Sequence, residues 1–499
     1  MAIKWSGLGP ELLLRLDRAS SRPLRSQLEA ALRDAIRTGR IAGDERLPSS
    51  RELARELGVS RGLVQECYSQ LLSEGYLTSH PGSATRAATG ARPVPSTRAA
   101  TGARPVPSRP AAPAATAQPL ITARPLIADF RSGVPDLASF PRADWAWAVR
   151  EACRTAPTAE FGYGDPRGSA RLREVLAGYL RRVRAAEAGP DAITISTGFA
   201  QGLILVLQAL ARTGVRCAAF EDPGYGRADA NEVLRAVAAQ GGLTIVPVPV
   251  DDSGLDVAAL AATDARVVVV TPAHQSPTGV VMPAARRHAL VDWARDRDGF
   301  IVEDDYDSEF RYDREPVGVL QGLAPGRVFT IGTASKALAP AVRLGWVLAP
   351  PQFADAVAAE KLISDRGSCV LDQLALAALL ESGRYDRQLR RMRGVYSRRR
   401  ARLIEALERH APSVALTGLA AGFHAVAHVP DRVDEEALIA AAADRRVGLE
   451  GMSAFRASGS AVPPQLVLGF GNVAERAIEP GIAAVADLLT GALRSPSPG

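Results

Sequence analysis

The chain has 499 residues and a hydrophobic content of 47%, enough for about three average domains or for one large body and a small one. It contains no run of 18 or more apolar residues, and its N-terminus lacks the basic, apolar and small-residue pattern of a secretory signal. The four cysteines lie far apart, without metal-binding or redox spacing. The sequence therefore predicts a cytoplasmic protein with reduced thiols, no membrane contact and no metal site.

The net charge of +6 is distributed unevenly along the chain. Residues 1–128 contain 18 Lys and Arg against 10 Asp and Glu, whereas residues 129–499 contain 42 against 44. A basic first part on a nearly neutral remainder indicates that the first part meets a polyanion such as DNA. A basic, solvated segment without a partner is the alternative that charge alone leaves open.

The segment 22–79 has the pattern of short helices joined by tight turns. Ser49 and Glu52 have the spacing of a capping box and begin one helix, which Gly58 ends. A further helix is predicted over about 61–73, and Pro81-Gly82 suits the tip of a two-stranded wing. Two helices joined by a short turn that contains glycine have the geometry of a helix-turn-helix.

The stretches RLPSSRELARELGVSR, YSQLLSEGYLTS and GSAT resemble the winged-helix head of the GntR transcription regulators over about 60 residues. The resemblance implies binding to double-stranded operator DNA. Ser60, Arg61 and Gln65 lie at the N-terminal end of the predicted recognition helix, where base edges and phosphates are within reach. The DNA-binding residues that the resemblance implies are Arg51, Ser60, Arg61, Gln65 and the wing backbone near Gly82.

The residues from Thr85 to Ser108 are one 12-residue unit, TRAATGARPVPS, written twice. Its prolines oppose helix and sheet, and its Ala, Thr, Gly and Ser residues supply no core. We therefore predict a flexible linker over 85–128, between a DNA-binding domain at 10–84 and a body at 129–495. The entropic cost of closing a loop rises slowly with its length, so a linker tolerates such a duplication.

Beyond the linker, apolar strands alternate with helices rich in Ala, Leu and Arg. The strands include RVVVVTPAH, GFIVEDDY and RVFTIGTASK. This alternation predicts an α/β body with a mostly parallel sheet. Ligands of such sheets bind at the carboxyl ends of the strands, where several chemically distinctive residues fall.

Lysine is rare in this chain, with only three among 60 basic residues. An arginine cannot form a Schiff base with an aldehyde, so Lys336, which follows a strand, indicates a need for the amine itself. Thr333, Ser335 and Arg343 beside it suit a phosphate group. Lys361 stands between polar residues and is predicted to be solvated.

Asp304 and Tyr306 lie on the same face of one predicted strand. A buried carboxylate there holds a pyridine nitrogen protonated, and the phenol reaches a ring oxygen. A solvated acidic strand end is the alternative, although the apolar run GFIV before it favours burial. Gly198 and Phe199 begin a helix, whose free backbone N–H groups suit a phosphate.

Together these features resemble the pyridoxal-phosphate-dependent aminotransferases of fold type I over most of residues 130–490. The resemblance implies a large sheet domain, a smaller C-terminal domain, and pyridoxal 5'-phosphate bound to Lys336 as a Schiff base. It also implies a homodimer, in which Tyr163 reaches the phosphate of the partner subunit, and an effector contact from Arg227. The further cofactor contacts that it implies are Asp304, Tyr306, Tyr225, Thr333, Ser335, Arg343, Gly198, Phe199 and His274.

A GntR head on such a body is the layout of the MocR family of pyridoxal-phosphate-dependent transcription regulators. The implied function is a regulator that senses the cofactor, or a small amine, through the internal aldimine on Lys336. Ser276 stands where active aminotransferases have Asn, and Val467 stands where they have the Arg that holds the substrate carboxylate, so net turnover is not expected. The alternatives are a working aminotransferase with an added DNA-binding domain, and a cofactor reservoir whose head is vestigial.

Overall fold

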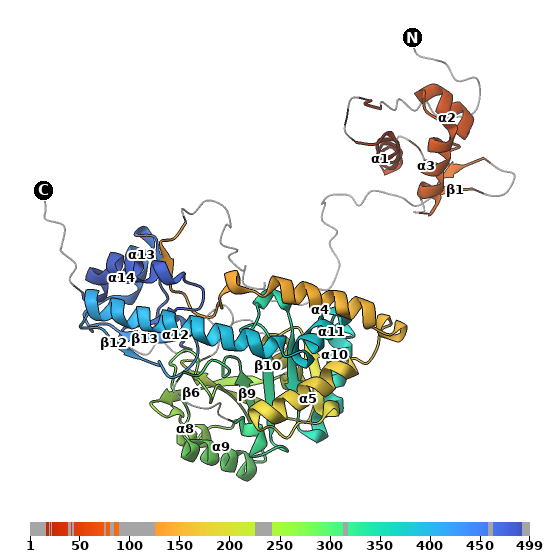
Figure 1. Ribbon diagram of the computed structural model, residues 1–499. Helices are drawn as coiled ribbons and strands as arrows, with labels where there is room; N and C mark the ends of the chain where they lie inside the picture. Colours follow the sequence, from red (N-terminus) through yellow and green to blue (C-terminus); the bar gives the residue numbers. More distant parts are fainter. Residues whose placement is uncertain are drawn as a thin grey trace, which may run out of the picture. The chain divides into compact units, whose positions relative to one another are not determined.

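The computed structural model of the chain describes residues 16–18, 20, 22–37, 41, 44–73, 76–79, 84–88, 125–224, 242–312, 318–457 and 463–491. The chain divides into two compact units, Met1–Ala114 and Ala115–Gly499, which we call the head and the body (Figure 1). No helix in the described ranges is long and apolar enough to cross a membrane. Three residues of the predicted sites, Gly82, Tyr225 and Arg227, lie outside those ranges.

The head consists of three helices and a two-stranded sheet packed around a small core. The elements are α1 (Leu24–Arg37), α2 (Ser50–Leu57), α3 (Arg61–Ser73), β1 (Leu77–Thr78) and β2 (Arg86–Ala87). Leu28, Leu53 and Leu71, from three different helices, are fully buried in this core. The predicted capping box is confirmed: Glu52 N donates to Ser49 Oγ at 3.3 Å, and Ser49 N donates to Glu52 Oε2 at 2.9 Å.

The wing of the head uses the first residues of the repeated segment. β1 and β2 pair antiparallel, with Leu77 opposite Ala87. Ala88 N donates to Tyr76 O at 2.9 Å, and Leu47 N donates to Thr85 O at 2.9 Å. The wing therefore reaches Ala88, four residues past the boundary expected from composition, because main-chain hydrogen bonding does not depend on the side chains that mark a linker.

The body is built on a mixed eight-stranded sheet in the order β4-β11-β10-β9-β8-β5-β6-β7. Strands β10, β9, β8, β5 and β6 run parallel, and β11 and β7 run antiparallel to their neighbours. The predicted α/β fold is thereby confirmed. The strands are β4 (Ile193–Ser196), β5 (Cys217–Asp222), β6 (Thr244–Asp251), β7 (Gly254–Leu255), β8 (Val267–Val270), β9 (Phe300–Asp305), β10 (Val328–Thr333) and β11 (Gly345–Leu348).

The central strands are buried on both faces, as the run Val267–Val270 shows, because helices cover the sheet. The helices that precede or connect the strands are α4 (Arg142–Thr155), α5 (Ala170–Arg184), α6 (Phe199–Arg212), α8 (Val257–Ala261), α9 (Ala284–Asp296), α10 (Ala354–Asp365) and α11 (Val370–Glu381). Helix α12 (Arg384–His410) leads from this layer toward the C-terminal part of the body (Figure 1).

The C-terminal part of the body is the smaller domain. Its core sheet is antiparallel, in the order β12-β13-β15, and a second pair joins β14 to β3 in parallel. The elements are β3 (Ala128–Asp129), β12 (Ala415–Thr417), β13 (His424–His428), α13 (Glu435–Asp444), β14 (Val447–Gly448), β15 (Gln465–Gly469) and α14 (Glu475–Leu489). Strand β3 ties the start of the body to this domain, so residues 128 and 129 lie beside residues far along the chain.

Candidate cofactor site and DNA-binding surface

A cavity of about 330 Å³ opens at the carboxyl ends of β8, β9 and β10. It has the size and position usual for a small-molecule site in an α/β fold. The structure brings seven of the predicted cofactor residues together in its wall. These are Phe199, Asp304, Tyr306, Thr333, Ser335, Lys336 and Arg343.

Lys336 follows β10, and its amine opens onto the cavity. Lys336 Nζ donates to Gly133 O at 2.6 Å. Burial lowers the pKa of this amine, while the carboxylates of Asp304 and Asp307 oppose that shift. An amine with a lowered pKa is a better nucleophile at neutral pH than an ordinary lysine, because a larger fraction of it is unprotonated.

Asp304 lies on the floor of the same cavity, at the end of β9. It is 4% exposed, and its Oδ1 has no hydrogen-bond partner in the described part of the chain. Burial raises the pKa of this carboxyl well above its usual range, and the charge of Lys336 offsets part of the rise. A buried oxygen without a partner is costly, and a protonated ring nitrogen of a ligand would satisfy it.

Tyr306 lines the cavity directly after the end of β9, two residues beyond Asp304. Its hydroxyl lies 3.1 Å from His274 Nδ1. Among the described residues, His274 is buried behind Tyr306 rather than in the cavity wall. The structure therefore places His274 against the Tyr306 hydroxyl, and its predicted direct contact with the cofactor stays a prediction.

The far end of the cavity collects the groups suited to a phosphate. Gly198, with φ of 110°, leads into α6, whose first backbone N–H groups have no partner within the helix. The positive φ favours glycine at this position, and Arg343 Nη1 lies 3.4 Å from where a Cβ would stand, so the guanidinium lies beside the helix start. Thr333 Oγ1 lies 2.8 Å from Ser335 Oγ, which puts two hydroxyls beside that arginine.

Tyr163 lies outside this cavity and is 83% exposed. Arg366 covers its ring, with Cζ 4.8 Å from the ring centroid. A contact with a partner subunit's phosphate stays a prediction. The expectation for Lys361 is wrong: its side chain is fully buried, and Nζ donates to Asp365 Oδ2 at 2.6 Å, because α10 packs that lysine inward.

Several cavity residues were not predicted. Ser132 and Gly133 come from the segment after β3, and Phe423, His424, Glu450 and Phe455 come from the smaller domain. They lie far from Lys336 in sequence, and none stands in a strand-end motif. Asp307 was also missed, although it continues the acidic run of EDDYDSE directly after Tyr306.

Val467, in the position expected for a substrate-binding arginine, is fully buried in an apolar cluster with Val426, Met452 and Phe455. Phe455 also lines the cavity. Here Phe455 contributes an apolar side chain to the wall, beside Glu450, and in the described residues of the cavity Arg343 is the arginine present.

The donor set of the cavity fits pyridoxal phosphate. Lys336 offers an amine for its aldehyde, and the unpartnered Asp304 Oδ1 offers an acceptor for its ring N–H. Tyr306 offers a hydroxyl for its ring oxygen, and the start of α6 with Arg343 offers N–H groups for its phosphate.

The head presents the predicted DNA-contact residues on its surface. Arg51 on α2, and Arg61 and Gln65 on α3, are exposed. Arg61 and Gln65 are four residues apart, so they share one face of the helix. Ser60 caps α3, since Leu63 N donates to Ser60 Oγ at 3.2 Å.

Two family models match the chain. Residues 24–86 match the bacterial regulatory proteins of the gntR family, and residues 127–461 match aminotransferase class I and II. The two matches cover the head and most of the body.

Curated relatives share this whole arrangement. The probable rhizopine catabolism regulatory protein MocR of Rhizobium meliloti is 33% identical over 481 residues, which cover 94% of each chain. The HTH-type pyridoxine biosynthesis transcriptional regulator PdxR of Corynebacterium glutamicum is also 33% identical, over 93% of this chain and 96% of its own.

The body also resembles solved aminotransferases. The kynurenine aminotransferase of Pyrococcus horikoshii is 26% identical, with a TM-score of 0.64, over 74% of this chain and 92% of its own. The body therefore has the fold of a pyridoxal-phosphate-binding aminotransferase. The chain belongs to the MocR-type regulators of the GntR family, which join a winged helix-turn-helix DNA-binding head to an aminotransferase-like body.

Proposed function

We propose that this regulator senses pyridoxal phosphate, or a small amine that reacts with it, in the cavity of the body, and changes operator binding by the head accordingly. The observation that carries the proposal is the pairing of Lys336 with the unpartnered Asp304 Oδ1 in one cavity. The names of two relatives, which connect them to pyridoxine biosynthesis and to rhizopine catabolism, are consistent with such effectors.

Each group in the cavity has one task in this proposal. Pyridoxal phosphate supplies an aldehyde that condenses with amines and a ring that withdraws electrons. Lys336 provides the amine that holds it, Asp304 keeps a proton on the ring nitrogen, and Tyr306 donates to the ring oxygen. Arg343, with the start of α6, holds the phosphate.

The apolar surroundings of Val467 favour sensing over turnover of amino acids. An α-carboxylate held without a bidentate arginine loses both affinity and orientation. An amine that lacks an α-carboxylate meets no such loss. Arg227, the residue predicted to approach an acid, lies outside the described residues and does not bear on this point.

The remaining parts of the proposal concern assembly. We place the protein in the cytoplasm, where its DNA target lies, and as a homodimer in which Tyr163 serves the partner's cofactor. The exposure of Tyr163 supports that arrangement. The residues between Ala88 and Pro125 would then link a DNA reader to a sensor.

The proposal is tested by measuring operator affinity with and without pyridoxal phosphate, and then with a panel of amines and amino acids. We expect the cofactor or an amine to change the affinity at least several-fold, and Lys336→Ala to abolish both the change and the visible absorbance of bound cofactor. Arg295→Ala, at an exposed position of α9 away from the cavity, is the control and should keep both. Quantitative conversion of the bound cofactor to its amine form by common amino acids, with release of keto acids, would instead establish an aminotransferase.

The head is tested separately with Arg61→Ala. Operator affinity should fall by about 1–3 kcal/mol, with a smaller loss for unrelated DNA. Arg55→Ala is the matched control, since Arg55 is an exposed arginine of the neighbouring helix that the prediction does not include. Equal losses on both kinds of DNA would make Arg61 a phosphate contact only.

A further inference from the structure

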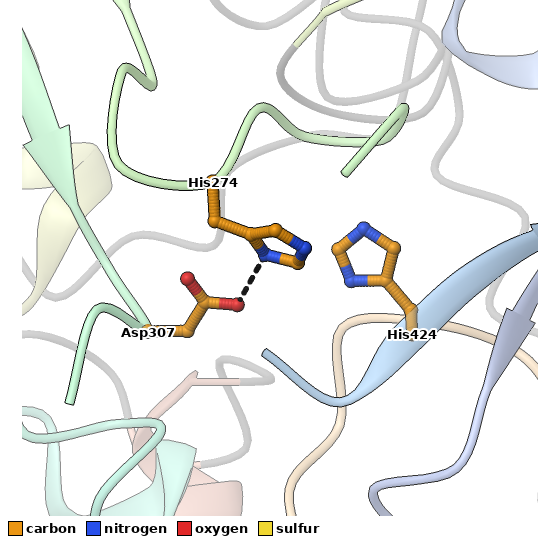
Figure 2. A group of neighbouring side chains, drawn as sticks. All are labelled: His274, Asp307 and His424. Atoms are coloured by element: carbon orange, nitrogen blue, oxygen red, sulfur yellow. Dashed lines mark hydrogen bonds and ion pairs between the residues drawn. The ribbon is translucent and has the colours of Figure 1, made fainter. Parts of the chain in front are cut away.

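Behind Tyr306 lies a group of buried polar side chains that the proposed function leaves unassigned. It contains His274, from the segment after β8, Asp307, just beyond β9, and His424, the first residue of β13 (Figure 2). All three are buried, with exposed fractions of 4% or less. Burying them together is costly unless their hydrogen bonds are satisfied.

Hydrogen bonds fix the proton on one of these rings. His274 Nδ1 lies 2.9 Å from Asp307 Oδ2, the contact drawn as a dashed line in Figure 2. A carboxylate only accepts, so Nδ1 carries the hydrogen and donates it. The same Nδ1 lies 3.1 Å from the Tyr306 hydroxyl, and Asp307 also hydrogen-bonds to Tyr306.

The backbone of the smaller domain holds this pair in place. Gly422 has φ of 68°, and a Cβ added there would lie 2.3 Å from Asp307 Oδ2 and 2.4 Å from His274 Cε1. Gly418 O lies 3.4 Å from His274 Nε2 on the other side of the ring. The imidazole therefore has little freedom to turn away from Tyr306.

His424 completes the surroundings. Its ring centroid lies 4.7 Å from that of His274, and its Nε2 has no hydrogen-bond partner among the described residues. Burial lowers the pKa of His424 well below its usual range, helped by His274 and Lys336. His424 is consequently a neutral ring packed against the pair.

We propose that His274 and Asp307 are positioning residues that set the direction of the Tyr306 hydroxyl. In this structure Tyr306 donates its hydrogen to Asp307, and His274 Nδ1 donates to the same carboxylate. The imidazole therefore weakens the hold of Asp307 on the Tyr306 hydrogen, so that the hydroxyl can donate to a ligand oxygen in the cavity instead. Without the imidazole, Asp307 would hold that hydrogen more strongly, and Tyr306 would donate less to the ligand. The inference rests on the proposed function, in which Tyr306 donates to the cofactor's ring oxygen.

The test is the pH midpoint of the absorbance change of pyridoxal phosphate bound to the full chain. The titratable and charged groups around the bound cofactor and Tyr306 are Asp304, Asp307, Lys336, His274 and His424, with Arg343 and Glu450 on the cavity wall. Tyr306→Phe removes the donor and should raise the midpoint by about one pH unit, the size of one hydrogen bond to a charged group. His274→Phe should raise it by roughly half as much.

Two further variants separate positioning from simple packing. His274→Asn places an amide N–H near the position of Nδ1 and should restore most of the wild-type midpoint. In the double variant with Tyr306→Phe, His274→Phe should add no further shift, because its effect passes through the missing hydroxyl. Cofactor content per chain and melting temperature show that each variant is folded.

The outcomes are distinguishable. If Tyr306→Phe leaves the midpoint unchanged, the proposed role of Tyr306 is wrong. If it shifts the midpoint but His274→Phe does not, or if the two shifts add, only the positioning inference is overturned. The side-chain atoms of His274, Asp307 and His424 that could bind a metal all lie within 4.8 Å of one another. The experiment therefore includes a further measurement, in which zinc alone is added and its binding per chain is determined. One zinc bound per chain, and lost in His424→Phe, would overturn the inference as well, since Nδ1 would then bind metal.

Discussion

The two faces of strand β9 carry acids of nearly equal burial that have different partners. Glu303, Asp304 and Asp305 are exposed by 1%, 4% and 9%. On one face, Arg184 Nε donates to Asp305 Oδ2 at 2.8 Å, and Leu320 N donates to Glu303 Oε2 at 2.9 Å. On the other face, Asp304 lines the cavity, and its Oδ1 has no hydrogen-bond partner among the described residues.

This difference separates structural acids from an acid available to a ligand. Burial alone does not distinguish them, and neither does chemistry, since all three are carboxyls. Glu303 Oε1 also lacks a partner, but Glu303 Oε2 accepts from Leu320 N and Thr330 Oγ1. What differs is that the protein supplies donors to the carboxyls of Glu303 and Asp305. Alternation along the strand assigns each acid to its face, so two adjacent aspartates have different roles.

The largest change in the free energy of unfolding is expected from Asp305→Ala. Arg184 is 1% exposed, and without Asp305 its guanidinium would stay buried without its main counter-charge. We expect the free energy of unfolding to fall by about 3–5 kcal/mol, measured on cofactor-free protein by thermal or denaturant unfolding. Asp304→Ala is the comparison and should cost much less, because it removes an acid that lacks a partner. Equal losses would end the distinction between the faces.

Asp304→Asn should weaken cofactor binding while leaving the stability of the protein nearly unchanged. The amide keeps the shape of the side chain and loses the charge that holds a proton on a ring nitrogen, so affinity for pyridoxal phosphate should fall about a hundredfold. Equilibrium titration of the apo protein by absorbance measures this, and the melting temperature of the apo protein should change little. Unchanged affinity would remove Asp304 from the cofactor site.

The sequence was most informative where the relevant physics is local. Strand alternation placed Asp304 and Tyr306 on one face, and the capping box placed the start of α2, because both depend on residues a few positions apart. The strand-end position of Lys336 likewise predicted its place in the cavity.

The sequence failed where distant segments meet. His424 and Glu450 reach the cavity only because the smaller domain folds over it, and Lys361 is buried because α10 packs it toward α6, where Gln201 accepts from its amine. None of these contacts leaves a periodic pattern or a motif. The wing strand within the repeat was missed for a related reason, since its pairing with β1 uses backbone groups alone.

The smallest change in stability is expected from Glu303→Gln, which also tests the comparison of the two faces of β9 most closely. Burial raises the pKa of Glu303 to about 7 from an ordinary value of 4.5. Between these values the unfolded chain releases the proton while the folded chain keeps it, so this group's contribution to stability is present at low pH and is lost as the pH rises to about 7.

A glutamine in that position is neutral at every pH. Wild type should therefore lose about 1–2 kcal/mol more than Glu303→Gln between pH 5 and pH 8, measured as melting curves of cofactor-free protein. Glu221, whose pKa burial also raises to about 7, titrates in both proteins and cancels in the difference. Identical pH profiles would mean that Glu303 is already ionised in the folded protein at neutral pH. The acids on that face would then be charged and need the neighbouring arginines for their stability.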